Sequence, residues 1–198
     1  FPDQFSNADN VEAHRKTTGP EITEQLGGVP DAFVAGQGTG GTVTGVAKHF
    51  EEAGGDTEIY ALEPYEAPML AKGTWGSHEI EGIGDGFIPE NLDASILDGI
   101  VRLKSEDSLE WADWLAKNEG IFCGISSGAN VKGSRMVLQE REDVDTVVTM
   151  INDVGERYFS TRLFEDDYEV EVPDRDHPMD ERSIEMLETY QDQWRIIQ

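Results

Sequence analysis

Apolar segments and amphipathic segments alternate along most of this chain. Four runs, most of them apolar, predict strands: 31–35, 57–64, 99–104 and 145–151. Helical spacing of apolar positions marks three segments that stand between them: 41–55, 105–120 and 127–141. Strands that alternate with helices are typical of an α/β domain, so we expect a Rossmann-like domain of three layers around a mainly parallel sheet.

Two shorter segments are less regular. IFCGI (121–125) is apolar and strand-like, and GERYFSTRLF (155–164) is expected to begin another helix. Ser105 is expected to be the N-cap of the helix 105–120, because a serine hydroxyl at that position accepts a backbone N–H of the first turn.

Two longer segments lie outside this alternation. Residues 66–93 form a glycine-rich connection, and connections of that length are usually functional. Residues 165–198 begin acidic and end in an apolar stripe with roughly helical spacing: Ile184, Leu187, Tyr190, Trp194 and Ile197. The stripe predicts either a helix docked on its own domain or a contact between subunits.

The chain has 15 Lys and Arg residues against 41 Asp and Glu, which gives a formal net charge of −26. A nucleic-acid partner is not expected, because binding its phosphates needs cations. The periodic segments and a hydrophobic content of 37% argue against a disordered chain. We therefore expect a folded protein of a salt-rich cytoplasm, where counterions screen the self-repulsion. No apolar run approaches the roughly 20 residues of a membrane span, so no membrane partner is expected.

The stretch VAGQGTGGTVTG (34–45) places its glycines where a strand gives way to a helix. Gly36, Gly38 and Gly41 fit the G-x-G-x-x-G pattern of dinucleotide-binding folds, and Glu63 stands where such folds carry a ribose-binding acid. A triphosphate site is not indicated, because no Lys-Ser or Lys-Thr pair follows the glycines.

The composition of the loop favours a ligand other than a dinucleotide; its central residues are Gly38, Thr39, Gly40, Gly41 and Thr42. A terminal phosphate monoester has three free oxygens, and it is best held by backbone N–H groups and hydroxyls at a helix N-terminus. The loop offers these donors and contains no Arg or Lys. The structural alternative is a glycine turn that only lets a helix and a strand pack closely.

GTGGTVTGVAKHF (38–50) resembles the phosphate loop of the cysteine synthase and cystathionine β-synthase family, which are pyridoxal-phosphate enzymes of fold type II. Five further segments resemble motifs of that family in the same order: QFSNADNVEAHRKTTGPEI (4–22), EPYEAPMLAKG (63–73), HEIEGIGDGFIPENLD (78–93), GIFCGISSGAN (120–130) and INDVGERYFSTRLF (151–164). The resemblance covers residues 1–164 and implies pyridoxal 5′-phosphate as the cofactor.

The resemblance also implies roles for particular residues. Gly38, Thr39, Gly40, Gly41 and Thr42 would bind the cofactor phosphate. Ser126 would face the pyridine nitrogen, and its alternative is the N-cap of the helix 127–141.

Four residues of two other motifs would lie along the cofactor or the substrate. Gly84 would lie along the cofactor ring, and Gln4, Gly82 and Gly86 would lie near the substrate. Taken alone, Gln4 is an ordinary surface side chain and these glycines are turn residues.

Two features of the family have no counterpart here. Its Schiff-base lysine and its Ser/Thr-Gly-Asn loop for the substrate carboxylate belong to a part that precedes these motifs, so no catalytic residue is expected in this chain. We expect a segment that enters from that part (1–22), a cofactor-binding α/β domain (23–164) and an acidic tail with a C-terminal amphipathic helix (165–198). The chain also departs from the family where Val154 follows Asp153, because Ser is usual at that position.

The resemblance implies a pyridoxal-phosphate-dependent β-replacement on a small amino acid, in a cytoplasmic homodimer. TTGPEI (17–22) favours the cysteine synthase reaction, in which O-acetylserine and sulfide give cysteine, over the cystathionine β-synthase reaction of serine with homocysteine. A non-catalytic binding module is the alternative of another class.

No metal site is expected. Cys123 is the single cysteine and lies in an apolar run, which predicts a buried inert thiol in a reducing compartment. The histidines show no metal-ligand spacing among themselves or with Cys123: His14, His49, His78 and His177.

Overall fold

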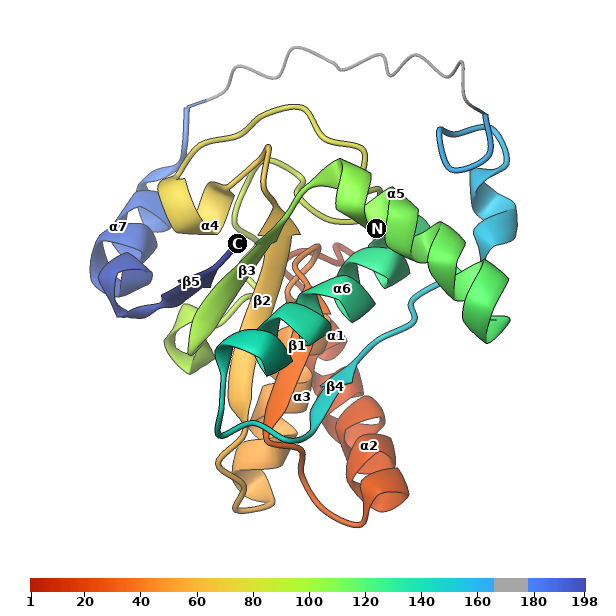
Figure 1. Ribbon diagram of the computed structural model, residues 1–198. Helices are drawn as coiled ribbons and strands as arrows, with labels where there is room; N and C mark the ends of the chain where they lie inside the picture. Colours follow the sequence, from red (N-terminus) through yellow and green to blue (C-terminus); the bar gives the residue numbers. More distant parts are fainter. Residues whose placement is uncertain (166–177) are drawn as a thin grey trace.

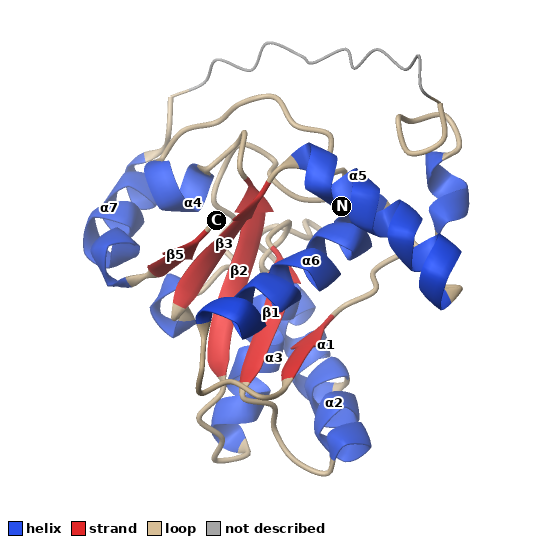
Figure 2. Cartoon of the chain, viewed as in Figure 1, coloured by secondary structure: helices blue, strands red, loops and turns tan. Residues whose placement is uncertain are grey.

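A computed structural model describes residues 1–165 and 178–198 of the chain. Its sheet has five strands, all parallel, in the order β4-β1-β2-β3-β5 (Figures 1 and 2). The strands are β1 (Ala32–Gly36), β2 (Glu58–Pro64), β3 (Gly99–Leu103), β4 (Val147–Thr149) and β5 (Arg195–Ile197). The prediction of an α/β domain built on a parallel sheet is confirmed.

Helices cover both faces of the sheet, and each face has its own apolar core (Figure 1). On one face, α3 packs its Val43 and Phe50 against the sheet, and on the other face α6 packs its Ile125 and Val137. The seven α-helices of the described residues are α1 (Ala8–Lys16), α2 (Thr18–Leu26), α3 (Gly41–Glu52), α4 (Met69–Lys72), α5 (Ser105–Trp114), α6 (Ile125–Glu140) and α7 (Glu181–Tyr190). Short turns complete the chain: the 3-10 turns η1 (Ala94–Ile96), η3 (Gly155–Tyr158) and η4 (Gln191–Gln193), and the π-helical turn η2 (Leu115–Glu119).

Strand β1 shows why the strands have few polar positions. Its side chains alternate between the two cores, with Phe33 in one and Val34 in the other, and both are fully buried. A parallel strand covered on both faces needs apolar residues at successive positions, and DAFVA has them.

The segment 121–125 is not a strand. It forms only one isolated bridge, between Cys123 and Val154, and α6 already begins at Ile125. The prediction of a helix in 155–164 is also wrong, since η3 is a single 3-10 turn.

Ser105 is not an N-cap. Lys104 occupies that position, Ser105 is the first residue of α5, and its hydroxyl instead accepts the backbone N–H of Glu79 at 2.9 Å. This bond ties α5 to the long connection 66–93.

The C-terminal stripe docks on its own domain, but it is not one helix. Helix α7 ends at Tyr190, and β5 then pairs in parallel with β3, with Ile197 opposite Val101. Leu187, Trp194 and Ile197 are buried in the two cores. The acidic part of the tail lies largely outside the described residues.

Residues 1–22 contain helical structure that the sequence pattern did not indicate. Helix α1 lies on α3, and α2 crosses the expected boundary between residues 22 and 23. Gly45 makes the contact possible, because a Cβ at that position would lie 2.4 Å from the carbonyl oxygen of Val11.

The connection 66–93 contains α4 and otherwise runs as a loop beside the carboxyl end of β1. The Gly84 N–H donates to the carbonyl of Gln37 at 3.2 Å, so the loop is fixed to the residue that follows β1. Trp75 and His78 hold the carbonyl of Gly84 from the other side, at 3.2 and 3.0 Å. Within the described chain, no helix has the length and apolar content that crossing a membrane requires.

Candidate cofactor site

The glycine-rich loop lies between the carboxyl end of β1 and the N-terminus of α3. Gly40 is the residue before α3 and has a left-handed φ of 78°. A Cβ on Gly40 would stand 2.8 Å from the backbone of Leu92, so glycine is required there for both its φ and its size. The open first turn of α3 leaves backbone N–H groups and a positive dipole end for an anion.

The two threonines of the loop are positioned by α1. Thr39 Oγ1 accepts from Asn10 Nδ2 at 3.0 Å and from the Gly41 N–H at 3.3 Å. Thr42 Oγ1 lies 3.1 Å from His14 Nε2, and burial lowers the pKa of His14, which favours the neutral imidazole. Because Thr39 is used as an acceptor, its own O–H remains available to donate to a ligand.

A cavity of about 340 Å³ opens beside this loop. One wall comes from the loop and α3, one from residues 81–83, and one from α6 and the segment after β4. Its lining residues are Gly36, Gly38, Thr39, Gly40, Thr42, Val43, Glu81, Gly82, Ile83, Ser126, Asn152, Asp153, Arg157 and Tyr158. The fold therefore brings the phosphate loop, Gly82 and Ser126 together, although they are far apart in the sequence.

Four of the residues singled out from the sequence do not line this cavity. Gly41 is the first residue of α3, and a Cβ there would meet Asn10 at 2.1 Å. Gly84 and Gly86 are buried against His78 and Trp75. The side chain of Gln4 is exposed, and its carbonyl accepts from Asn10 and Asn91, at 2.8 Å each. Their roles toward cofactor and substrate stay predictions.

Ser126 lies in the first turn of α6 and faces the cavity. The N-cap of α6 is Gly124, so the alternative reading of Ser126 as an N-cap is wrong. The next residue is used differently: Ser127 is fully buried, and its hydroxyl accepts the backbone N–H of Asn152 at 3.0 Å. That bond fixes the segment after β4 to the start of α6.

The residues after β4 belong to the motif 151–164, but the sequence assigned them no role in the site. Tyr158 donates its hydroxyl to Asp153 Oδ2 at 2.6 Å, and burial together with this carboxylate raises the pKa of Tyr158. A signal was available, because residues that follow a parallel strand at its carboxyl end gather where ligands bind in α/β sheets. Asn152 and Asp153 follow β4 in this way.

Glu63 does not take the role of a ribose-binding acid. It is buried at the end of β2, and its carboxylate accepts the backbone N–H groups of Leu70 at 2.7 Å and Ala71 at 3.0 Å. Burial raises its pKa to about 7. The carboxylate therefore serves the N-terminus of α4 and is unavailable to a dinucleotide.

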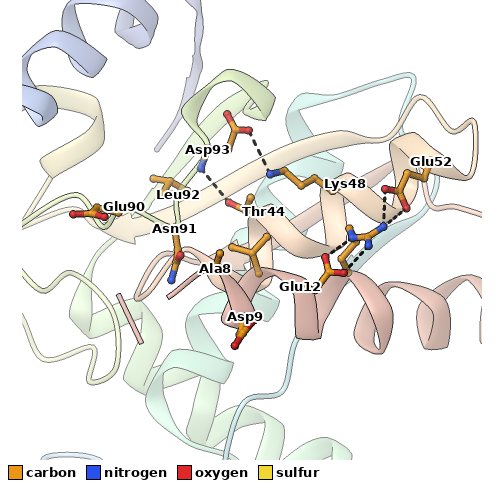
Figure 3. Close-up of a pocket in the computed structure, with 12 residues that line it drawn as sticks. Ala8, Asp9, Glu12, Thr44, Lys48, Glu52, Glu90, Asn91, Leu92 and Asp93 are labelled. Atoms are coloured by element: carbon orange, nitrogen blue, oxygen red, sulfur yellow. Dashed lines mark hydrogen bonds and ion pairs between the residues drawn. The ribbon is translucent and has the colours of Figure 1, made fainter. Parts of the chain in front are cut away.

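A larger cavity of about 770 Å³ lies between α1, α3 and residues 90–93 (Figure 3). Five of its twelve lining residues are acidic, and the two basic side chains in it face acids: Arg15 lies 2.8 Å from Glu52, and Lys48 lies 3.9 Å from Asp93. The lining of this cavity carries a formal charge of −3, against −1 for the smaller cavity, and only the smaller one borders the N-cap of α3, so the cavity at the glycine loop is the better anion site.

The cysteine and the histidines have structural partners. Cys123 is buried, and burial followed by the Asp153 carboxylate raises its pKa, which disfavours a reactive thiolate. His49 lies 3.1 Å from the Thr23 hydroxyl, and His177 lies outside the described residues. In the described ranges, no cluster of three or more His, Cys, Asp or Glu residues could hold a metal ion.

A family model of pyridoxal-phosphate dependent enzymes matches residues 1–153. This chain belongs to that family. The match includes the glycine loop, the connection 66–93, Ser126 and Asp153, and of the residues that line the cavity it leaves out Arg157 and Tyr158. The resemblance inferred from the motifs is thereby confirmed.

The relatives in this family include cysteine synthases. Cysteine synthase 3 of Caenorhabditis elegans is 45% identical over 83% of this chain and 49% of its own length. Cysteine synthase A of Escherichia coli is 44% identical over 82% of this chain and 53% of its own length. This chain thus spans about half the length of these relatives.

Solved structures agree with the fold. The cysteine synthase of Entamoeba histolytica is 33% identical, covers 96% of this chain and 53% of its own, and superposes with a TM-score of 0.78. An O-ureido-L-serine synthase is 39% identical, covers 87% of this chain and 54% of its own, and also has a TM-score of 0.78. The three-layer fold is therefore that of fold type II pyridoxal-phosphate enzymes.

Proposed function

We propose that this chain is the pyridoxal-phosphate-binding part of a cysteine synthase-type enzyme, in which sulfide replaces the acetoxy group of O-acetylserine to give cysteine and acetate. The observation that supports it most strongly is the glycine loop, which presents N–H groups and two threonine hydroxyls beside a cavity in a chain 44% identical to a cysteine synthase. The chemistry of this donor set suits a phosphate monoester, so the residues present fit the cofactor.

The proposed roles follow from the position of each residue. The N–H groups of residues 38–42 and the hydroxyls of Thr39 and Thr42 hold the phosphate, and Ser126 offers a hydroxyl to the pyridine nitrogen. The neighbouring loop, with Gly82 in the cavity wall and Gly84 and Gly86 behind it, limits the room left for a small amino-acid substrate. When bound, the cofactor supplies an electron sink for carbanion chemistry, and the protein supplies binding and orientation.

We also propose that the Schiff-base lysine and the loop for the substrate carboxylate lie outside these 198 residues, in a longer protein. Two observations support this. Of the described residues that line the cavity, none is a lysine, and the relatives are about twice as long as this chain.

The first prediction tests phosphate recognition with deoxypyridoxine phosphate, which is the cofactor without its aldehyde and therefore cannot react with surface lysines. The chain should bind it, measured by calorimetry, and should bind deoxypyridoxine without phosphate far more weakly. Thr42→Val removes one hydroxyl contact to a charged group and should weaken binding by about 1.5–3 kcal/mol, roughly 10- to 150-fold. Gly40→Val should weaken it more, because its side chain meets Leu92.

Two matched variants control this experiment. Thr189→Val removes a hydroxyl from α7, remote from the loop, and Gly54→Val places a side chain at a glycine with a φ of 73° and no neighbour within 4 Å. Both should bind the probe as the wild type does. If the chain binds NADH and not deoxypyridoxine phosphate, the proposed function is wrong.

A further inference from the structure

Asn10 joins helix α1 to two other segments of the chain. Its Nδ2 group donates to the carbonyl of Gln4 at 2.8 Å and to Thr39 Oγ1 at 3.0 Å. A carbonyl oxygen can only accept, so the amide nitrogen of Asn10, and not its oxygen, must face Gln4. The same nitrogen therefore donates its second proton to Thr39.

The Thr39 hydroxyl receives two donors. Its Oγ1 accepts from Asn10 Nδ2 and from the Gly41 N–H, the latter at 3.3 Å. A hydroxyl oxygen has two lone pairs, so these two donors occupy both of them. The Thr39 proton has no acceptor within residues 1–165 and 178–198, and Thr39 lines the cavity. This proton is therefore left to donate to a group inside the cavity.

Thr42, the other threonine of the loop, is not fixed in the same way. Its Oγ1 lies 3.1 Å from His14 Nε2, and a nitrogen of a neutral imidazole can either donate or accept. The direction of the Thr42 proton thus depends on the tautomer of His14. The direction of the Thr39 proton is set by two groups that can only donate.

An effect of Asn10 on a ligand has to pass through Thr39. Asn10 is not among the described residues that line the cavity, so it does not touch a ligand there. The Gln4 carbonyl has a second donor, because Asn91 Nδ2 also reaches it at 2.8 Å. The fold therefore keeps this anchor when Asn10 is replaced, and the contact that is lost without a substitute is the one to Thr39.

We propose that Asn10 is a positioning residue for phosphate recognition, because it turns the Thr39 proton toward the cavity; this inference rests on the proposed function. A hydroxyl that is oriented before binding loses less freedom when the ligand arrives, which strengthens binding. A donor also makes a stronger hydrogen bond to a charged oxygen than to a neutral one. Since Thr39 can only donate, the ligand atom beside it has to be an acceptor, as every free oxygen of a fully ionised phosphate is.

The test is a double-mutant cycle in the 198-residue chain, with deoxypyridoxine phosphate as the probe and calorimetry as the measurement. Thr39→Val removes the hydroxyl and should weaken binding about 10-fold or more. Asn10→Ala should weaken binding about three- to tenfold when Thr39 is present. In the Thr39→Val background, Asn10→Ala should change the affinity by less than about twofold, because no hydroxyl is left to orient.

Two further variants sharpen the result. Asn10→Asp keeps the shape of the side chain but offers a carboxylate, which accepts the Thr39 proton and turns it away from the cavity. This variant should therefore weaken binding more than Asn10→Ala does. Asn7→Ala is the matched control, because Asn7 is the exposed N-cap of α1 and its side chain bonds to Asp9 and Pro2. It should bind the probe as the wild type does.

Each outcome decides a different point. Equal losses from Asn10→Ala in both backgrounds would show that Asn10 supports the fold of the loop rather than the Thr39 hydroxyl, which overturns this inference and leaves the proposed function in place. An Asn10→Ala variant that binds the probe as tightly as the wild type overturns it as well. Failure of the probe to bind the wild type overturns the proposed function and this inference with it. Asn10→Leu, which keeps the volume and has no donor, takes the place of Asn10→Ala in the cycle if that variant does not fold.

Discussion

Glu63 is a carboxyl group in the interior whose pKa lies near neutrality. It is 1% exposed, and burial raises its pKa from 4.5 to about 7 despite two N–H donors and the charge of Arg102. A folded-state pKa above the unfolded value means that the folded state binds the proton more tightly. The fold is therefore most stable with respect to Glu63 below pH 4.5, where the group is protonated in both the folded and the unfolded state. This stability is lost as the pH rises through about 7.

This gives a second prediction. Glu63→Gln removes the titration, so the stability of the variant relative to the wild type should improve by roughly 2–3 kcal/mol between pH 5 and pH 8. Urea unfolding at both pH values measures this difference, and the exposed Glu51→Gln controls for the loss of one negative charge. A difference that does not change with pH would show that Glu63 is already ionised at pH 5.

A third prediction concerns Gly41. Its Cβ would stand 2.1 Å from Asn10 Oδ1, so Gly41→Ala should displace the Asn10 side chain, break its bonds to the Gln4 carbonyl and to Thr39, and destabilise the fold by about 1–3 kcal/mol. Probe affinity should fall with it, because Asn10 also holds the Thr39 hydroxyl. Gly28→Ala has no neighbour within 4 Å and should leave thermal unfolding and binding unchanged. Equal melting temperatures for the two variants would contradict the predicted clash.

Some residues of the site could be predicted from the sequence and others could not. The phosphate loop was predictable, because glycines and hydroxyls in succession at a strand-to-helix junction have few structural uses. Ser126 was predictable only through a family motif. Asp153 and Tyr158 belong to the motif 151–164, but the sequence assigned them no role, because only the parallel sheet, with β4 beside β1, shows that they line the cavity.

The main strands were predictable as elements, and the edges of the fold were not. Strands β1, β2 and β3 are buried on both faces, so their apolar runs are unambiguous. Residues 121–125 are equally apolar, yet only Cys123 finds a β partner. The C-terminal stripe was predicted as one helix, because its apolar residues are three or four positions apart. The same spacing also occurs when a short helix is followed by a strand, as α7 is by β5.

The fourth prediction separates the two parts of that stripe. Trp194 is 6% exposed in the same core as Leu187, and Trp194→Ala should destabilise the fold by about 3–5 kcal/mol. Ile184 is 44% exposed on α7, and Ile184→Ala should change stability by less than about 0.5 kcal/mol. Chemical unfolding measures both, and similar losses would indicate one continuous apolar face as the stripe first suggested.

At the scale of the whole molecule, the charge dominates. A net charge of −26 on 198 residues means that like charges repel across most of the surface. Salt reduces the range of this repulsion, because the Debye length falls from about 8 Å at 0.15 M to about 3 Å at 1 M. The fifth prediction is a melting temperature that rises steeply from low to molar KCl. An uncharged osmolyte of equal osmolarity should produce a smaller rise. A melting temperature that stays flat across the KCl series would refute the expectation of a salt-rich environment.

The position of β5 at the edge of the sheet has a consequence for synthesis. Its partner β3 leaves the ribosome long before β5, so the hydrogen-bonding edge of β3 is uncovered while the intervening chain is translated. An uncovered strand edge invites pairing with other nascent chains. A stop codon just before Arg195 would remove β5 and leave the edge of β3 permanently exposed. We expect this shortened protein to aggregate into inclusion bodies, which is a larger effect than the loss of three paired residues would have on stability alone.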